Sequence, residues 1–203
     1  MLLLVATGHP DFMRYAHPNL GRLFGPRDTS SLTKSALIVP WAADNDCYNG
    51  LDAAAYRRMI AKISGVPGCL FVTVPDVVAD HKATLALWHE WLPELVEHDL
   101  PPAFVAQDGA TSAEIPWDAM ACLFIGGSTI YKLSNDAAEL AREAKERGKL
   151  VHMGRVNTAR RIMYAHAIGC DSVDGTKWCR FKETYLSEGL RLVSEPQQLQ
   201  LDH

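Results

Sequence analysis

Short apolar runs rich in β-branched residues alternate along the chain with longer stretches of helical periodicity. The runs are continuous rather than polar at every second position, as expected for strands buried on both faces in a parallel sheet covered by helices. The pattern predicts strands within residues 2–8, 36–41, 69–76, 102–109, 122–128, 149–156 and 171–176, with a weaker one within 190–195. Helices are predicted at 52–64, 78–97, 113–120, 134–147 and 157–168.

This repetition favours an α/β fold, either an open doubly wound sheet or a closed (β/α)8 TIM-type barrel. No GxGxxG follows the first strand and no GxxxxGK[ST] occurs in the sequence, so a nucleotide-cofactor sheet has no support and no cofactor is expected. The prediction is therefore one compact barrel domain over residues 1–203. It is incomplete unless residues 190–195 supply the eighth strand, and the polar tail 196–203 is expected to fray.

Polar or glycine residues follow almost every predicted strand. Because the carboxyl ends of parallel strands lie on one face, these residues should converge, although each alone is also typical of a helix N-cap or a turn. The converging set is Asp44, Asp46, Asp76, Gln107, Gly126, Gly127, Gly154 and Asp174.

Carboxylates, an amide and glycine peptide groups together suit a planar ligand that makes hydrogen bonds along its edge, such as a purine base. A carboxylate beside a sugar can attack the anomeric carbon while a second carboxylate moves protons. The residue types thus point to exchange or cleavage of an N-glycosidic bond.

The net charge and the cysteine content restrict which partners and which kinds of site the chain can have. A formal charge of -4 and a pI near 6.0 give no global attraction to nucleic acid, so such a partner needs a local basic patch. Five cysteines without CxxC or CxH spacing make disulfides and a zinc site unexpected. With no membrane segment expected either, the prediction is a cytoplasmic protein. The basic candidates for nucleic-acid binding are Arg155, Arg160, Arg161, Lys177 and Arg180.

Six segments in order carry a family resemblance: "ADNDCYN", "VTVPDV", "FVAQDG", "FIGGST", "VHMGRVN" and "GCDSVDGT". Their order resembles that of the tRNA-guanine transglycosylase superfamily, whose (β/α)8-barrel enzymes replace guanine in a nucleic acid with a 7-deazaguanine base. "GCDSVDGT" is most similar to the family segment that holds the nucleophile. The resemblance covers residues 36 to 176.

The resemblance implies a role for each matching residue. Asp174 would be the nucleophile that attacks C1′, and Asp44 the general acid/base, with Asp46 as a competitor. Asp76 and Gln107 would bind the base edge, and Gly126 and Gly127 would offer peptide donors. Met153 and Gly154 would form the wall of the base pocket.

The chain also departs from the family. Only Cys179 follows Asp174, so the zinc subdomain of the tRNA enzymes is not expected, and the chain is more similar to reduced phage or bacterial relatives that act on DNA. The predicted partners are DNA, or else tRNA, and a purine or 7-deazapurine base, with a homodimer left open. Trp178 could stack in the place of a flipped base, and His152 is expected to be a core or supporting residue. The alternatives are an N-glycosidase or nucleoside hydrolase that uses the same carboxylates, and a non-catalytic barrel that binds nucleic acid or protein.

Overall fold

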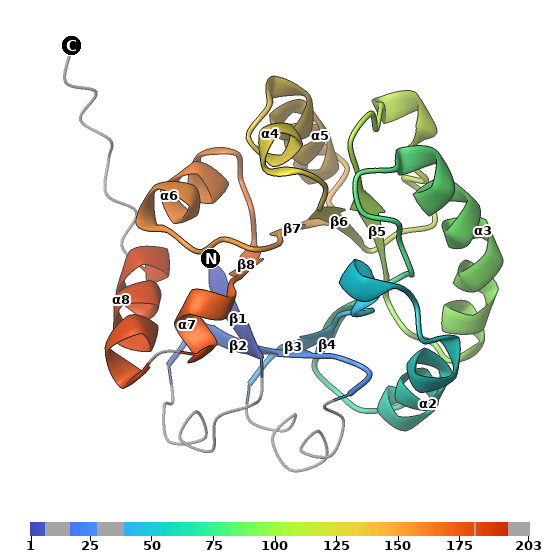
Figure 1. Cartoon of the computed structure of the whole chain (residues 1–203), viewed down its shortest axis with the longest axis horizontal. Coiled ribbons are helices and arrows are strands. Elements are labelled where there is room, and N and C mark those ends of the chain that lie inside the picture. Colours follow the sequence, from blue (N-terminus) through green and yellow to red (C-terminus); the bar gives the residue numbers. More distant parts are fainter. Residues whose placement is uncertain (7–16, 28–38, 181, 195–203) are drawn as a thin grey trace.

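The computed structural model of the chain describes residues 1–6, 17–27, 39–180 and 182–194. Eight strands form a closed barrel in which each strand pairs in parallel with the next and the last pairs with the first (Figure 1). The predicted (β/α)8 class is therefore confirmed. The strands are β1 (Leu2–Ala6), β2 (Leu20–Phe24), β3 (Trp41–Ala43), β4 (Cys69–Thr73), β5 (Pro102–Ala106), β6 (Cys122–Ile125), β7 (Leu150–Met153) and β8 (Ser172–Asp174).

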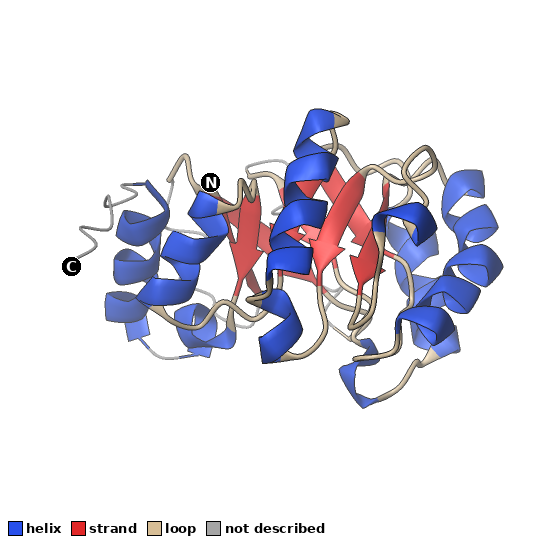
Figure 2. Ribbon diagram, turned by 90° about the horizontal axis from the view of Figure 1, so that it is seen from above, coloured by secondary structure: helices blue, strands red, loops and turns tan. Residues whose placement is uncertain are grey.

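The described helices lie outside the strands, and Figure 2 shows them on either side of the barrel and across the side that faces the viewer. Most begin at a serine, threonine or aspartate whose side chain accepts a hydrogen bond from a backbone N–H of the first turn, which satisfies a donor that the helix leaves free. They are α2 (Ala53–Ile63), α3 (His81–Glu97), α4 (Thr129–Lys132), α5 (Asn135–Glu146), α6 (Ala159–Ala167), α7 (Thr176–Arg180) and α8 (Lys182–Ser194), with 3-10 turns η2 (Cys47–Asn49) and η3 (Ser112–Glu114).

Several elements differ from the prediction, among them the strand predicted at 36–41, of which only Trp41 lies in β3. Residues 190–195 were predicted as the eighth strand, but 190–194 belong to α8. The missing strand is β2, which sequence periodicity did not reveal because "LGRLF" contains a glycine and an arginine. Gly21 is needed there, since a Cβ atom would lie 2.9 Å from the carbonyl oxygen of Pro40. The helix predicted at 113–120 is also wrong, because only η3 forms before Pro116.

The frayed tail predicted at 196–203 lies outside the described residues.

The apolar core has two parts because strand residues alternate between the barrel interior and the helical layer. One cluster, formed by Leu4, Ala42, Phe71, Ala103 and Cys122, fills the interior. A much larger cluster packs the outer faces of the strands against the helices. The barrel is consequently solid below its mouth.

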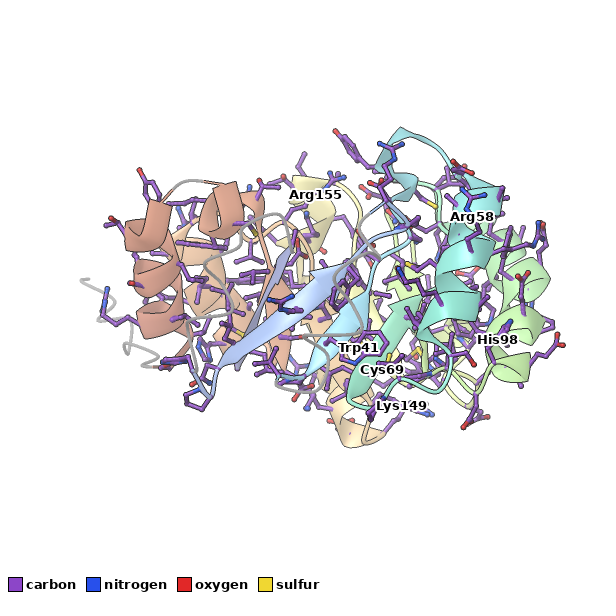
Figure 3. The ribbon with its side chains drawn as sticks, turned by 90° about the horizontal axis from the view of Figure 1, so that it is seen from below. Trp41, Arg58, Cys69, His98, Lys149 and Arg155 are labelled. Carbon is purple, nitrogen blue, oxygen red and sulfur yellow. The ribbon has the colours of Figure 1, made fainter. Side chains whose placement is uncertain are left out.

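The carboxyl ends of the strands all lie at one end of the barrel. Figure 3 shows Arg155, which follows β7, at this end, whereas Lys149, which precedes β7, lies at the opposite end with Trp41 and Cys69, the first residues of β3 and β4. Among the described residues, no helix is long and apolar enough to cross a membrane.

Candidate active site

A pocket of about 550 Å³ opens at the carboxyl ends of the strands. It is lined by residues that follow or end β3 to β8, so the predicted convergence of strand ends is confirmed. The predicted residues in its lining are Asp44, Asp46, Asp76, Gln107, Gly126, Gly127, Gly154, Arg155 and Asp174.

Asp174 ends β8 and projects into this pocket with 19% of its side chain exposed. Its Oδ1 accepts hydrogen bonds from Nε2 of His152 at 3.0 Å and from the backbone N–H of Arg155 at 3.3 Å. Within the described part of the chain, Oδ2 accepts no hydrogen bond. One oxygen is therefore anchored, and the other is available to a ligand.

His152 orients this carboxylate from inside the barrel. The imidazole is fully buried between the rings of Phe71 and Phe124, whose centroids lie 5.1 and 4.5 Å away. Its Nδ1 lies 2.8 Å from Oγ of Ser172. A neutral ring that donates from Nε2 to Asp174 accepts at Nδ1 from the serine hydroxyl, so the three groups form a consistent chain. The prediction of a supporting role for His152 agrees with this geometry.

Asp44 follows β3 and is half-buried in the pocket wall. Burial, together with the nearby charges of Asp174 and Asp76, raises its pKa to about 7, although hydrogen bonds from the Asn45 N–H and the Thr73 hydroxyl to Oδ1 oppose this shift. A carboxyl with a pKa near neutrality can both give and take a proton.

Asp46 was predicted as a rival to Asp44 for proton transfer. It lies at the pocket rim with a left-handed backbone (φ 56°), and its carboxylate is 3.5 Å from Nε of Arg27. Its side chain is 43% exposed, so Asp46 is more open to solvent than Asp44. The two aspartates thus occupy different positions, with Asp44 in the pocket wall and Asp46 at the rim.

Asp76 follows β4 and is held by two amides. Oδ1 accepts a hydrogen bond from Nδ2 of Asn45 at 2.7 Å, and Oδ2 accepts one from Nε2 of Gln107. Burial raises the pKa of Asp76, against the effect of both amides and of Arg155. Gln107 is itself buried, and its Oε1 accepts from the backbone N–H of Ala79 at 2.8 Å. Gln107 thus positions Asp76, which faces the pocket.

The two glycines after β6 form part of the pocket lining. A Cβ on Gly126 would lie 2.6 Å from Val105, and Gly127 has a φ of 77° that disfavours other residues. The prediction that Gly126 offers a peptide donor is wrong, because its N–H already donates to the carbonyl of Ala106. Asp108 stabilises the turn that contains these glycines, because its carboxylate accepts hydrogen bonds from the N–H and the hydroxyl of Ser128.

Gly154 and Met153 lie on opposite faces of the barrel wall. Gly154 lines the pocket, and a Cβ there would lie 2.7 Å from the ring of Phe124. The prediction that Met153 forms a wall of the pocket is wrong, because alternation places His152 inside and Met153 in the outer core. Phe124 and Val105 provide the apolar lining instead.

Two cations border the pocket beside these carboxylates. The guanidinium of Arg155 stacks over the ring of Tyr48 at 3.7 Å from its centroid, and both residues line the pocket. Arg155 has a left-handed backbone (φ 60°), which directs its N–H to Asp174. Lys132, at the end of α4, is almost fully buried, and its Nζ donates to the carbonyl of Gly154 at 3.1 Å.

The other basic residues predicted to bind nucleic acid differ in their exposure and in their partners. Arg160 is exposed on α6, and Arg161 reaches back to Thr129 at 3.4 Å. Lys177 pairs with Glu188 at 3.3 Å. Arg180 ends α7, and its side chain lies outside the described part of the structure.

The proposed stacking role of Trp178 is wrong, because this ring is 1% exposed and donates from Nε1 to the carbonyl of Val156.

The pocket lining also contains polar side chains that the sequence did not single out, notably Lys132, Asn45 and Tyr48. Asn45 and Tyr48 stand beside the predicted Asp44, so proximity in the sequence could have suggested them. Lys132 lies within a helix and had no such signal. Among the described residues, no group of three or more His, Cys, Asp or Glu could hold a metal ion.

Comparison with known proteins establishes the architecture. No protein-family model matches the chain, and no curated protein matches it. Among solved structures, one described as "Native KDPGal structure" aligns with a TM-score of 0.57 and 10% identity, over 95% of this chain and 92% of that one. The BexX/CysO complex of Amycolatopsis orientalis aligns with a TM-score of 0.51 and 16% identity, over 95% and 78%. These similarities show the barrel fold alone.

Proposed function

We propose that this protein is a base-exchange enzyme that replaces guanine in a nucleic acid, with DNA preferred over tRNA, by a 7-deazaguanine derivative. The observation that carries the proposal is the convergence of three carboxylates, Asp174, Asp44 and Asp76, from three strand ends on one pocket. The three carboxylates lie in three different environments, which suits three different roles: nucleophile, acid/base and ligand of the base. The resemblance of the six ordered segments to the transglycosylase superfamily supports the same assignment.

In the proposed reaction, the free Oδ2 of Asp174 attacks C1′ of the target nucleotide. The C1′–O bond forms as the C1′–N bond to guanine breaks, and the electron pair of that bond goes to the departing base. Asp44, protonated at the start, gives its proton to the base nitrogen. The incoming base then returns a proton to Asp44 and attacks C1′, which releases Asp174. A pKa near 7 suits a group that gives and takes this proton in one cycle.

The anchoring of Asp174 supports this role. A nucleophile must hold one oxygen on the line of attack, and the hydrogen bond from His152 fixes the carboxylate without occupying Oδ2. Because the imidazole is packed between two aromatic rings, the whole unit has little freedom to turn. The pocket can thus hold Asp174 in position before the substrate binds.

The pocket also suits a flipped base. Asp76 offers carboxylate acceptors for the N–H groups of guanine, and the ring of Tyr48, covered on one face by Arg155, adds an aromatic surface to the pocket lining. A base must leave the stack before C1′ is accessible, at a cost of a few kcal/mol. Arg155 lines the pocket, and Arg160 and Arg161 follow it in the first turn of α6; these three side chains would meet the phosphates of the displaced strand.

The decisive experiment measures incorporation of radiolabelled guanine into double-stranded DNA, single-stranded DNA and tRNA, in parallel, by wild type and Asp174→Asn. We expect label to enter DNA with wild type and not with Asp174→Asn. Release of free base without incorporation would favour the N-glycosidase alternative instead. Tight nucleic-acid binding that survives Asp174→Asn, with neither exchange nor release, would refute an enzymatic role.

A further inference from the structure

Lys132 is a buried ammonium group at the wall of the pocket. Its side chain is 6% exposed, although lysine is seldom buried without a strong reason. An ammonium group has three N–H donors, and among the described residues Nζ donates one hydrogen bond, to the carbonyl of Gly154 at 3.1 Å. The other donors lie beside the pocket that Lys132 and Gly154 line together.

The electrostatic surroundings of Lys132 agree with this position. Burial lowers the pKa of its ammonium group to about 8, with a further lowering by Arg155 and Arg161 and an opposing effect of Asp174 and Asp108. The nucleophile is thus within electrostatic reach of the ammonium group. Lys132 makes no ion pair with a carboxylate of the described residues, so its ammonium group remains available to a ligand.

The pocket therefore has two walls of opposite hydrogen-bonding character. Asp76, after β4, presents acceptors, whereas Lys132, in the segment between β6 and β7, presents donors. Guanine has the complementary arrangement. Its N1–H and N2–H₂ donors lie on one edge, and its O6 and N7 acceptors lie toward the other. A guanine with its donors at Asp76 would turn its acceptors toward the side of the pocket where Lys132 lies.

We propose that Lys132 determines base specificity by donating a hydrogen bond to N7 of the purine. This inference rests on the proposed function and adds the side of the base that the pocket recognises. A base with carbon at position 7 lacks the acceptor and would leave a buried ammonium donor without a partner, which is the strongest way for a site to reject an analogue. An incoming 7-deazaguanine would then need an acceptor in its position-7 substituent to recover the contact.

The test is the affinity of the free bases guanine and 7-deazaguanine, which differ at one ring atom, measured by calorimetry without nucleic acid. We expect wild type to bind guanine about tenfold or more tightly than 7-deazaguanine, as is typical of a hydrogen bond from a charged donor. Lys132→Met should reduce this ratio to about one. A lysine that only supports the Gly154 carbonyl would instead weaken both bases equally and leave the ratio unchanged.

Lys149 offers a matched control, because its Nζ also donates to a backbone carbonyl, that of Met120, at 2.9 Å, but at the opposite end of the barrel (Figure 3). Lys149→Met should leave the ratio intact. If Lys132→Met does not fold, Lys132→Gln removes the charge with less apolar change and should bring the ratio below about threefold.

Equal affinity of wild type for the two bases, or a ratio that survives loss of the ammonium group, overturns the role of Lys132 and leaves base exchange standing. Failure of wild type to bind either base contradicts the proposed function itself.

Discussion

The raised pKa of Asp44 predicts that this residue destabilises the folded protein at neutral pH. In Asp44→Asn the neutral amide has nearly the same shape, and its Oδ1 can still accept from the Asn45 N–H and the Thr73 hydroxyl, at 3.0 and 3.2 Å in wild type. The substitution thus removes the charge and keeps the local geometry. It isolates the cost of an ionised carboxylate in the pocket wall.

The sign and size of the effect follow from linkage between protonation and folding. In the unfolded chain Asp44 titrates near 3.8, and in the folded protein near 7, so the folded state binds the proton more tightly. Below pH 4, wild type should therefore be as stable as Asp44→Asn. As the pH rises through 7, the free energy of unfolding of wild type should fall below that of the variant. A shift of about three pKa units sets an upper limit of about 4 kcal/mol, and solvent at the half-buried carboxyl reduces this to about 1–3 kcal/mol.

Urea denaturation of wild type and Asp44→Asn between pH 4 and pH 9 tests this reasoning. The variant should match wild type near pH 4 and exceed its free energy of unfolding by about 1–3 kcal/mol above pH 8, while base exchange falls strongly. A variant that is less stable than wild type at pH 8 would refute the argument. So would a stability difference that does not change with pH, because only titration of Asp44 predicts the pH dependence.

Other changes test the supports of the site. His152→Ala should lower kcat for base exchange about a hundredfold through misplacement of Asp174, with KM nearly unchanged, and His152→Gln should recover part of the rate in the same assay. Burial would raise the pKa of Asp108, but hydrogen bonds from Ser128 outweigh this effect and lower the pKa. Asp108→Asn should therefore reduce the free energy of unfolding at pH 7 by about 1–2 kcal/mol, as measured by urea denaturation. The difference from wild type should disappear as the pH falls below 4, where Asp108 becomes protonated. Gly154→Ala should weaken guanine binding severalfold in calorimetry, because the added methyl group would displace the ring of Phe124, which lines the pocket.

Much of the site was predictable because one rule governs all strands of a parallel barrel. Polar residues after strands meet at one face whatever the lengths of the connections, so the sequence alone places Asp44, Asp76, Gln107 and Asp174 together. The rule needs only the end of each apolar run. It does not need the register of one strand against its neighbour.

Predictions that depended on register or on local backbone were less successful. Whether His152 or Met153 faces the pocket is decided by alternation along a strand of four residues, and a motif containing both cannot choose between them. The separate roles of Asp44 and Asp46 arise from the left-handed backbone at position 46, which turns that side chain to the rim. Lys132 belongs to a four-residue helix and follows no periodic pattern at all.

The interior of the barrel explains how so small a fold can hold three carboxylates. Inward-facing positions below the mouth are apolar, as Leu4, Ala42 and Phe71 show, and the next layer carries His152 and Ser172. Charged side chains occur above this layer, where solvent and hydrogen bonds reach them. The apolar layer removes water from one side of the carboxylates, which raises the pKa of Asp44, while the polar layer supplies the donor that orients Asp174. The same stack of layers thus stabilises the barrel and sets the chemistry of its mouth.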